Sequence, residues 1–183
     1  MALSPLDFFL SLCYTYLTKL RRGIMQKLLL RVYSSKKASL ALKIISHASV
    51  LISVLAYLAL IAYTYAKEPR DAVFMFLFSA IPFVIVTLVR KFFNAPRPYE
   101  LYGFYEIPPK DKRGESFPSR HVFSAFIIAT LTTTVSIPLA LALFAIGFCL
   151  AASRVLLGMH FIRDTVAGAL IGIISGIIGI III

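Results

Sequence analysis

Long apolar segments decide what this chain of 183 residues can fold into. The first, residues 44–65, has 22 positions. At ~1.5 Å per residue, a helix over that segment is roughly 33 Å long, which is enough to cross a bilayer. We predict four further spans from similar apolar runs, over residues 72–89, 119–136, 138–157 and 161–183. The sequence therefore predicts an all-α fold, a polytopic membrane helix bundle with five clear transmembrane helices.

The composition agrees and excludes other classes of protein. Hydrophobic residues make up 60% of the chain and charged residues only 15%, which leaves too little polar surface to cover a water-soluble globule. A chain this apolar does not stay disordered, because it buries enough surface to offset its ordering entropy. The two cysteines, Cys13 and Cys149, are too few for a disulfide-stabilised scaffold.

Residues 3–20 form one more apolar and aromatic segment, whose placement the sequence leaves open. It contains Asp7, and basic residues follow it, whereas a cleaved signal peptide carries its positive charge before the apolar run. We expect this segment either to span the membrane or to lie in its interface. The chain is accordingly divided into residues 1–37, an N-terminal apolar helix with a basic amphipathic segment, and residues 38–183, a membrane-embedded core.

Positive charge is concentrated beside the spans. The chain has 19 Lys and Arg against 8 Asp and Glu, a formal net charge of +11, and no acidic residue lies between Lys19 and Lys43. Such basic blocks are typical of lipid-headgroup contacts or of orientation signals. Nucleic acid is not expected as a partner, because its binding needs a soluble basic surface that this composition hardly allows.

Three polar segments, residues 19–43, 90–120 and 153–164, are predicted to share one side of the membrane, because the chain alternates between faces at each span. His160 and Asp164 are four residues apart, so on a helix they share a face where the carboxylate accepts the Nδ1 proton. That arrangement suits a nucleophilic or basic histidine. Arginines and histidines kept together at a membrane border indicate an oxyanion site, most commonly for phosphate.

Three blocks of residues carry a resemblance to a known family. They are Arg90-x6-Arg97-Pro98, then Pro118-Ser119-Arg120-His121, then Ser153-Arg154-x5-His160-x3-Asp164. This pattern resembles the tripartite signature of the type 2 phosphatidic acid phosphatase family, which vanadium haloperoxidases share, and the resemblance covers about residues 72–183. It implies that residues 38–183 are the core of an integral membrane lipid phosphatase.

Two positions depart from the family pattern. The first block normally opens with lysine, and here Arg90 stands in that register with Lys91 one place late. The second block normally has glycine where this chain has Arg120, and that glycine contributes a backbone N–H to phosphate. The side chain of Arg120 is therefore expected to point out of the pocket, and a positive φ at this position is expected to impair catalysis.

The resemblance also implies a role for each matching residue. His160 attacks phosphorus and becomes phosphohistidine, Asp164 holds its ring, and His121 protonates the leaving oxygen and then activates water. The phosphate-binding set is Arg90 or Lys91, Arg97, Ser119, the backbone of Arg120, and Arg154. The resemblance implies no cofactor and no metal ion, and the sequence indicates no obligate protein partner.

Alternatives remain beside this interpretation. A zinc site from His121, His160 and Asp164 has suitable ligand types, but the surrounding arginines oppose a cation. A lipid transporter or flippase is the other alternative, and no inverted repeat supports it. His47 has no arginine or second histidine close to it in the sequence. We interpret it as an interhelical hydrogen-bonding residue or an interface residue.

Substrate and location are inferred from the expected enzyme class, a phosphoric monoester hydrolase or diphosphatase. The expected substrate is an anionic lipid: phosphatidylglycerophosphate, lipid A 1-phosphate, undecaprenyl diphosphate or phosphatidate. The expected location is the bacterial cytoplasmic (inner) membrane, crossed several times, with the active site on the outer, periplasmic face.

Overall fold

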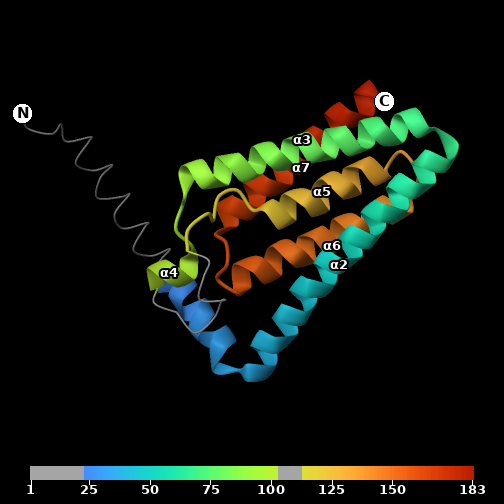
Figure 1. The fold of residues 1–183 in the computed structure, drawn as a ribbon. Helices are drawn as coiled ribbons and strands as arrows, with labels where there is room; N and C mark the ends of the chain where they lie inside the picture. Colours follow the sequence, from blue (N-terminus) through green and yellow to red (C-terminus); the bar gives the residue numbers. More distant parts are fainter. Residues whose placement is uncertain (1–22, 103–112) are drawn as a thin grey trace, which may run out of the picture.

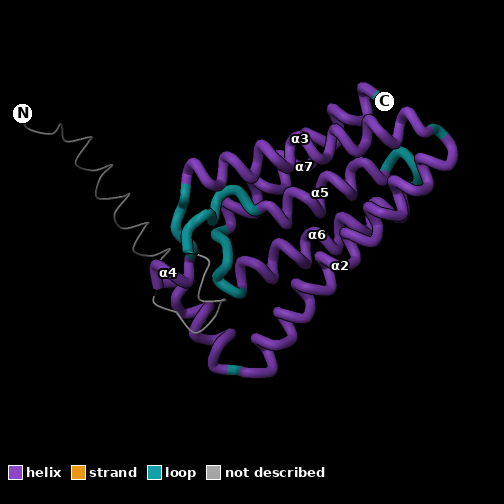
Figure 2. Tube along the Cα trace, viewed as in Figure 1, coloured by secondary structure: helices purple, strands orange, loops and turns teal. Residues whose placement is uncertain are grey.

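The computed structural model describes residues 23–102 and 113–183, and every regular element in these two ranges is a helix (Figure 1, Figure 2). A helix over residues 23–34 comes first. It is followed by α2 (Lys36–Lys67), α3 (Pro69–Phe93), α4 (Pro98–Tyr102), α5 (Arg120–Thr132), α6 (Ile137–Leu156) and α7 (Ile162–Ile182). The predicted all-α class is confirmed. The apolar segment 3–20 lies outside the described residues, so its place in the membrane stays a prediction.

The helices α2, α3, α6 and α7 each lie in a segment long and apolar enough to cross a membrane. Their outer faces expose large apolar side chains, as Leu55, Ile85, Leu141 and Ile174 do. Such faces would be unfavourable in water and suit contact with lipid chains. The chain is therefore a multi-pass membrane protein, as the apolar segments predict.

The central helix α5 is shorter than the span predicted over residues 119–136. It has 13 residues and ends at Thr132, within a run of consecutive threonines. The hydroxyls of Thr133 and Thr134 donate to the carbonyls of Thr130 and Leu131. The backbone N–H groups of Thr133 and Thr134 donate to the same two carbonyls, three residues back, so the chain leaves the α-helix in a tighter turn. Ser136 then caps the start of α6. At ~1.5 Å per residue α5 is roughly 20 Å long, too short to cross a bilayer alone.

The surrounding helices make that length acceptable. α5 packs against α2, α3, α6 and α7 and lies in the middle of the bundle (Figure 1). Its closest neighbour is α7, which presents glycines to it. A Cβ added at Gly168 would lie 2.5 Å from the Ser119 carbonyl oxygen, and one at Gly172 would lie 2.6 Å from that of Phe123. These glycines, four residues apart, therefore let α5 and α7 pack closely.

Polar connections gather at one end of the bundle. The loops 94–97, 113–119 and 157–161 lie together there with α4, and the C-terminus lies at the other end (Figure 1, Figure 2). The helix over residues 23–34 belongs to the same end, because the Tyr33 hydroxyl donates to the Leu157 carbonyl at 3.1 Å. For the described residues, the prediction that these segments share one side is confirmed.

Candidate active site

A cavity of about 840 Å³ opens among the loops at this end. Residues of α2, α3, α5 and α6 line it, together with parts of the loops between the helices. His121 and His160, two of the candidate catalytic residues, are among the lining residues. The cavity is large enough for the head of a lipid and brings the three sequence blocks together.

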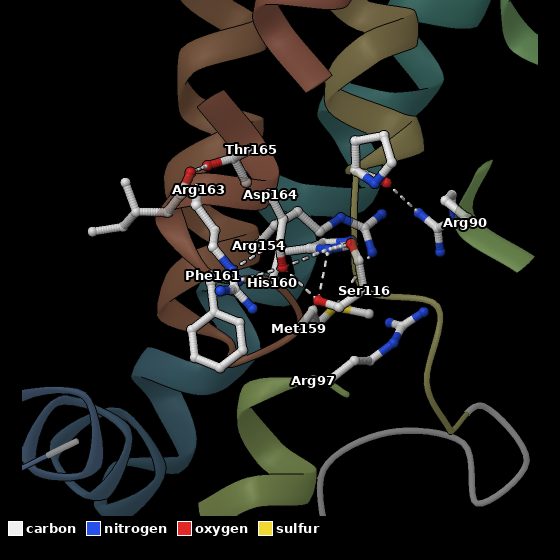
Figure 3. Close-up of polar contacts among 12 residues, drawn as sticks. Arg90, Arg97, Ser116, Arg154, Met159, His160, Phe161, Arg163, Asp164 and Thr165 are labelled. Carbon is white, nitrogen blue, oxygen red and sulfur yellow. Dashed lines mark hydrogen bonds and ion pairs between the residues drawn. The ribbon is translucent and has the colours of Figure 1, made fainter. Parts of the chain in front are cut away.

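Three arginines converge on the space beside His160 from separate segments (Figure 3). Arg90 comes from the last turn of α3, Arg97 from the segment before α4, and Arg154 from the last turn of α6. They are only 4%, 6% and 8% exposed. Arg90 Nη1 donates to the Pro118 carbonyl at 3.0 Å, and Arg97 Nε donates to the Gly114 carbonyl at 2.9 Å. Backbone acceptors therefore fix two guanidinium groups in place.

Several buried polar atoms around this space lack a partner. The Nε atoms of Arg90 and Arg154 and the Oγ of Ser119 form no hydrogen bond in the part of the chain that the structure describes. Buried polar groups are normally satisfied, and like-charged guanidinium groups repel one another. Arg90 and Arg154 line the cavity, so an anion with several acceptor oxygens would offset their charge there, and a phosphate group has that chemistry.

The imidazole of His160 is held in a single tautomer. Its Nδ1 donates to the Ser116 carbonyl at 2.8 Å, because a carbonyl can only accept, so Nε2 carries the lone pair. The ring is 2% exposed. Burial lowers the pKa of His160 well below its ordinary 6.5, and the positive charges of Arg97, Arg90 and Arg154 lower it further. The ring is therefore neutral at neutral pH.

Asp164 does not meet His160 in the predicted way. α7 begins at Ile162, so His160 precedes the helix, and its Nδ1 lies 3.9 Å from Asp164 Oδ2. That oxygen instead accepts from Ser116 Oγ at 2.5 Å and from the Phe161 backbone N–H at 3.0 Å. The expected direct hydrogen bond on a shared helix face is therefore wrong. Asp164 caps the start of α7, and Ser116 bridges the two residues.

Ser116 is the residue that sequence reasoning missed. It is fully buried, its carbonyl accepts from His160, and its hydroxyl donates to Asp164 (Figure 3). Its own N–H donates to the Ala95 carbonyl at 2.8 Å, which ties the first block to the second. The only signal in the sequence is its position three residues before Ser119, and that spacing says nothing about a hydroxyl reaching α7.

The second block begins α5. Ser119 precedes the helix, and its N–H donates to the Asp164 carbonyl at 2.9 Å. Arg120 is the first helical residue, and it is not among the described non-glycine residues with positive φ. The replaced glycine therefore causes no backbone strain here. Arg120 is among the lining residues, but its guanidinium lies over the ring of Phe83, which is not among them, 5.5 Å from the ring centroid. The expectation that the side chain points out of the pocket therefore stays a prediction. The aromatic face of Phe83 offers the Arg120 charge a favourable position.

The family can now be assigned. The PAP2 superfamily model matches residues 71–183, which carry all three blocks. The chain belongs to the PAP2 superfamily.

Two solved structures resemble this PAP2 chain. Aquifex aeolicus LpxE matches with 26% identity and a TM-score of 0.60, covering 84% of this chain and 93% of its own. The first transmembrane PAP2-type phosphatidylglycerolphosphate phosphatase from Bacillus subtilis matches with 18% identity and a TM-score of 0.67, covering 96% of this chain and 92% of its own. The second likeness shows the fold alone. No curated protein sequence matches the chain.

The PAP2 site resolves the choice between two neighbouring cations. Arg90 is buried and lines the cavity, whereas Lys91 is exposed on α3 and is not among the lining residues. Consecutive helical residues point about 100° apart, so one α3 register cannot turn both into the pocket. Two of the predicted phosphate-binding residues, Lys91 and Ser119, are not among the lining residues: Lys91 is exposed on α3, and Ser119 is fully buried.

The zinc alternative lacks a suitable ligand set. Within residues 23–102 and 113–183, no three His, Cys, Asp or Glu side chains come together as a metal site, so His121, His160 and Asp164 do not. Asp164 also points its Oδ2 at Ser116 rather than at a shared centre. The described geometry favours an anion at this position, in agreement with the three buried arginines.

Proposed function

We propose that this PAP2 chain is an integral membrane phosphatase that hydrolyses the phosphate of an anionic lipid through a phosphohistidine intermediate, without a metal ion or other cofactor. One observation carries the proposal. The neutral His160, with Nε2 left as its nucleophilic atom, stands beside three buried arginines whose positive charge suits a phosphate.

In the first step, Nε2 of His160 attacks phosphorus and the bond to the lipid oxygen breaks. Arg90, Arg97 and Arg154 hold the non-bridging oxygens, with the hydroxyl of Ser119 and the backbone N–H of Arg120 at the start of α5. His121 donates a proton to the leaving oxygen, so the lipid departs as an alcohol or as a lipid monophosphate. The phosphoryl group stays on His160.

In the second step, His121 takes a proton from water, and the resulting nucleophile attacks phosphohistidine. The nitrogen–phosphorus bond breaks and orthophosphate leaves, which returns both histidines to their starting states. Ser116 and Asp164 act as positioning residues. The Ser116 carbonyl keeps the proton on Nδ1, and the Asp164 carboxylate at 3.9 Å offsets the positive charge that forms on the ring.

A lipid substrate is supported by the cavity wall. Val50, Leu51 and Val54 of α2 line the same cavity as the arginines, so a charged head and an apolar chain both find matching surfaces. The candidates are phosphatidylglycerophosphate, lipid A 1-phosphate, undecaprenyl diphosphate and phosphatidate.

A phosphate-release assay over these four lipids tests the proposal. We expect release in the presence of EDTA, inhibition by vanadate, and loss of release in His160→Ala. Rapid quenching at alkaline pH should trap labelled phosphohistidine in the wild type and none in the variant. Activity that disappears with chelator, or that survives in His160→Ala, would contradict the proposal.

We also propose that residues 38–183 form the phosphatase core, that residues 1–37 form the basic N-terminal unit, and that the site faces outward from a bacterial cytoplasmic membrane. Lys37→Cys in a Cys13→Ser/Cys149→Ser background reports the orientation, because Lys37 is exposed near the start of α2. An impermeant thiol reagent should label it in intact cells. Labelling confined to inverted vesicles would place the site in the cytoplasm.

A further inference from the structure

The cavity carries more positive charge than one phosphate monoester needs. Six of its lining residues are cationic, namely Lys43, Arg90, Arg97, Arg113, Arg120 and Arg154. Among the described residues, Glu115 is the one acidic lining residue, and none of the six cations forms an ion pair with a carboxylate. A phosphate monoester carries at most about two negative charges. The surplus indicates a ligand with a second anionic group.

Part of this surplus lies on α2, outside the segment that the family model matches. Lys43, Ser46 and His47 line the cavity from the first half of this helix. Ser46 is 1% exposed, and its Oγ has no hydrogen-bond partner in the described chain. Nδ1 of His47 donates to the Lys43 carbonyl at 2.7 Å, which directs Nε2 away from the helix backbone. An ammonium group, a buried hydroxyl and an imidazole together suit anionic oxygens.

The wall changes character along the helix. Val50, Leu51 and Val54 follow Lys43 and His47 on the cavity side of α2. At ~1.5 Å per residue, Val54 lies roughly 16 Å along the axis from Lys43. A ligand whose anionic group meets Lys43 and His47 can therefore continue as a hydrocarbon chain along the valines. This second anionic group then lies between the chain and the phosphate that reacts at His160.

We propose that Lys43, Ser46 and His47 form a second anion subsite, which binds a further phosphate between the scissile phosphate and the hydrocarbon chain of the substrate. The inference rests on the proposed function and names its substrate class, lipids with two phosphates in series. Hydrolysis breaks the terminal phosphorus–oxygen bond, consumes one water and releases orthophosphate. The second phosphate remains on the lipid product in the subsite.

Two lipids with the same acyl chains test the subsite. Phosphatidylglycerophosphate has a phosphodiester between its terminal phosphate and its chains, and phosphatidate has only the phosphate that is hydrolysed. We expect the wild type to prefer the first lipid in kcat/KM. Lys43→Gln should lose about tenfold on the first lipid, as removal of a charge-assisted hydrogen bond does, and less than about twofold on phosphatidate.

Lys37→Gln is the matched control, because Lys37 is an exposed lysine of the same helix that does not line the cavity. It should leave both substrates unchanged. Ser46→Ala and His47→Gln provide independent variants and should show the same selective loss. Size-exclusion chromatography in detergent checks that each variant is folded.

The pair of polyprenyl diphosphate and polyprenyl monophosphate repeats the comparison with directly linked phosphates. A selective loss in either pair supports the subsite and identifies the spacing that it accepts. Equal losses within both pairs, or no loss in any, would overturn the subsite. Failure of the proposed function gives a different result, since the wild type would then release no phosphate from any of the lipids.

Discussion

The two cationic regions of the cavity differ in how firmly their groups are held. Arg90 and Arg97 are buried and donate to backbone carbonyls, so their geometry is set before any ligand arrives. Lys43 and His47 on α2 have exposed side chains. Preorganised groups contribute most where charge develops in a transition state, whereas a flexible lysine contributes mainly to ground-state binding. One cavity can in this way hold a rigid set of groups suited to catalysis beside a flexible set suited to substrate choice.

The largest expected effect is at His160, the centre of the rigid region, which consists of His160 and the buried arginines around it. His160→Ala removes the proposed nucleophile, and the rate of phosphate release should fall on the order of 10⁴-fold, as when a nucleophile is removed from other covalent enzymes. The measurement is single-turnover phosphate release in micelles, with circular dichroism to confirm helical content. A fall no larger than that of Lys43→Gln would erase the distinction between the two regions.

A smaller loss is expected when one buried guanidinium is removed. Arg154→Ala should lower kcat on the order of 10²- to 10³-fold, about 3 to 4 kcal/mol, by analogy with the loss of an oxyanion donor. Arg154→Lys should recover only part of this loss, because an ammonium group lacks the bidentate geometry of a guanidinium. If KM rises and kcat stays unchanged, Arg154 belongs with the substrate-selecting residues of α2.

Ser116 tests whether the rigid region depends on its positioning residues. Ser116→Ala keeps the carbonyl that holds His160 but removes the hydroxyl that donates to Asp164. We expect kcat to fall about tenfold with little change in KM, as the loss of a hydrogen bond to a charged group would produce. Ser116→Thr should restore most of the activity, because it restores the hydroxyl. A failure of threonine to rescue would leave Ser116 with a packing role only.

The last prediction concerns the protonation of His160, which should leave activity at neutral pH unchanged. Its pKa lies well below 6.5, so its nuclear magnetic resonance signals should remain those of the neutral ring as the pH falls through 6.5. An unfolded histidine binds a proton near pH 6.5 and the folded one does not, so His160 makes the free energy of unfolding decrease as the pH drops below that value. Arg97→Ala removes a neighbouring positive charge and should raise this pKa. Titration of the ring near pH 6.5 in the wild type would contradict the proposed electrostatic setting.

Local patterns predicted much of the fold and most of the site. The apolar runs placed α6 and α7 closely, since hydropathy is a property of consecutive residues. They made α5 too long, because hydropathy does not register the turn at Thr133 and Thr134, where the backbone hydrogen bonds reach back only three residues. The three blocks identified His160, Arg97 and Arg154 as site residues because their spacings are properties of the sequence, and the structure places all three at the cavity.

Sequence patterns predicted less well which residues meet across the bundle. Asp164 was predicted to meet His160 directly, but Ser116, 48 positions before Asp164, reaches its carboxylate first. The choice between Arg90 and Lys91 depends on the rotation of α3 about its axis, which spacing within one helix does not fix. His47 has no motif around it, and its place in the cavity follows only from how α2 packs.

The sequence by itself therefore determined that this chain is a membrane helix bundle with a phosphatase-like set of arginines and histidines. Tertiary structure alone decided which groups hold His160, which cation of α3 enters the pocket, and that α2 adds Lys43, Ser46 and His47 to it. The physical reason is range. Apolar periodicity and motif spacing act over a few residues, whereas the hydrogen bond from His160 to Ser116 joins residues 44 positions apart and exists only when the helices are packed.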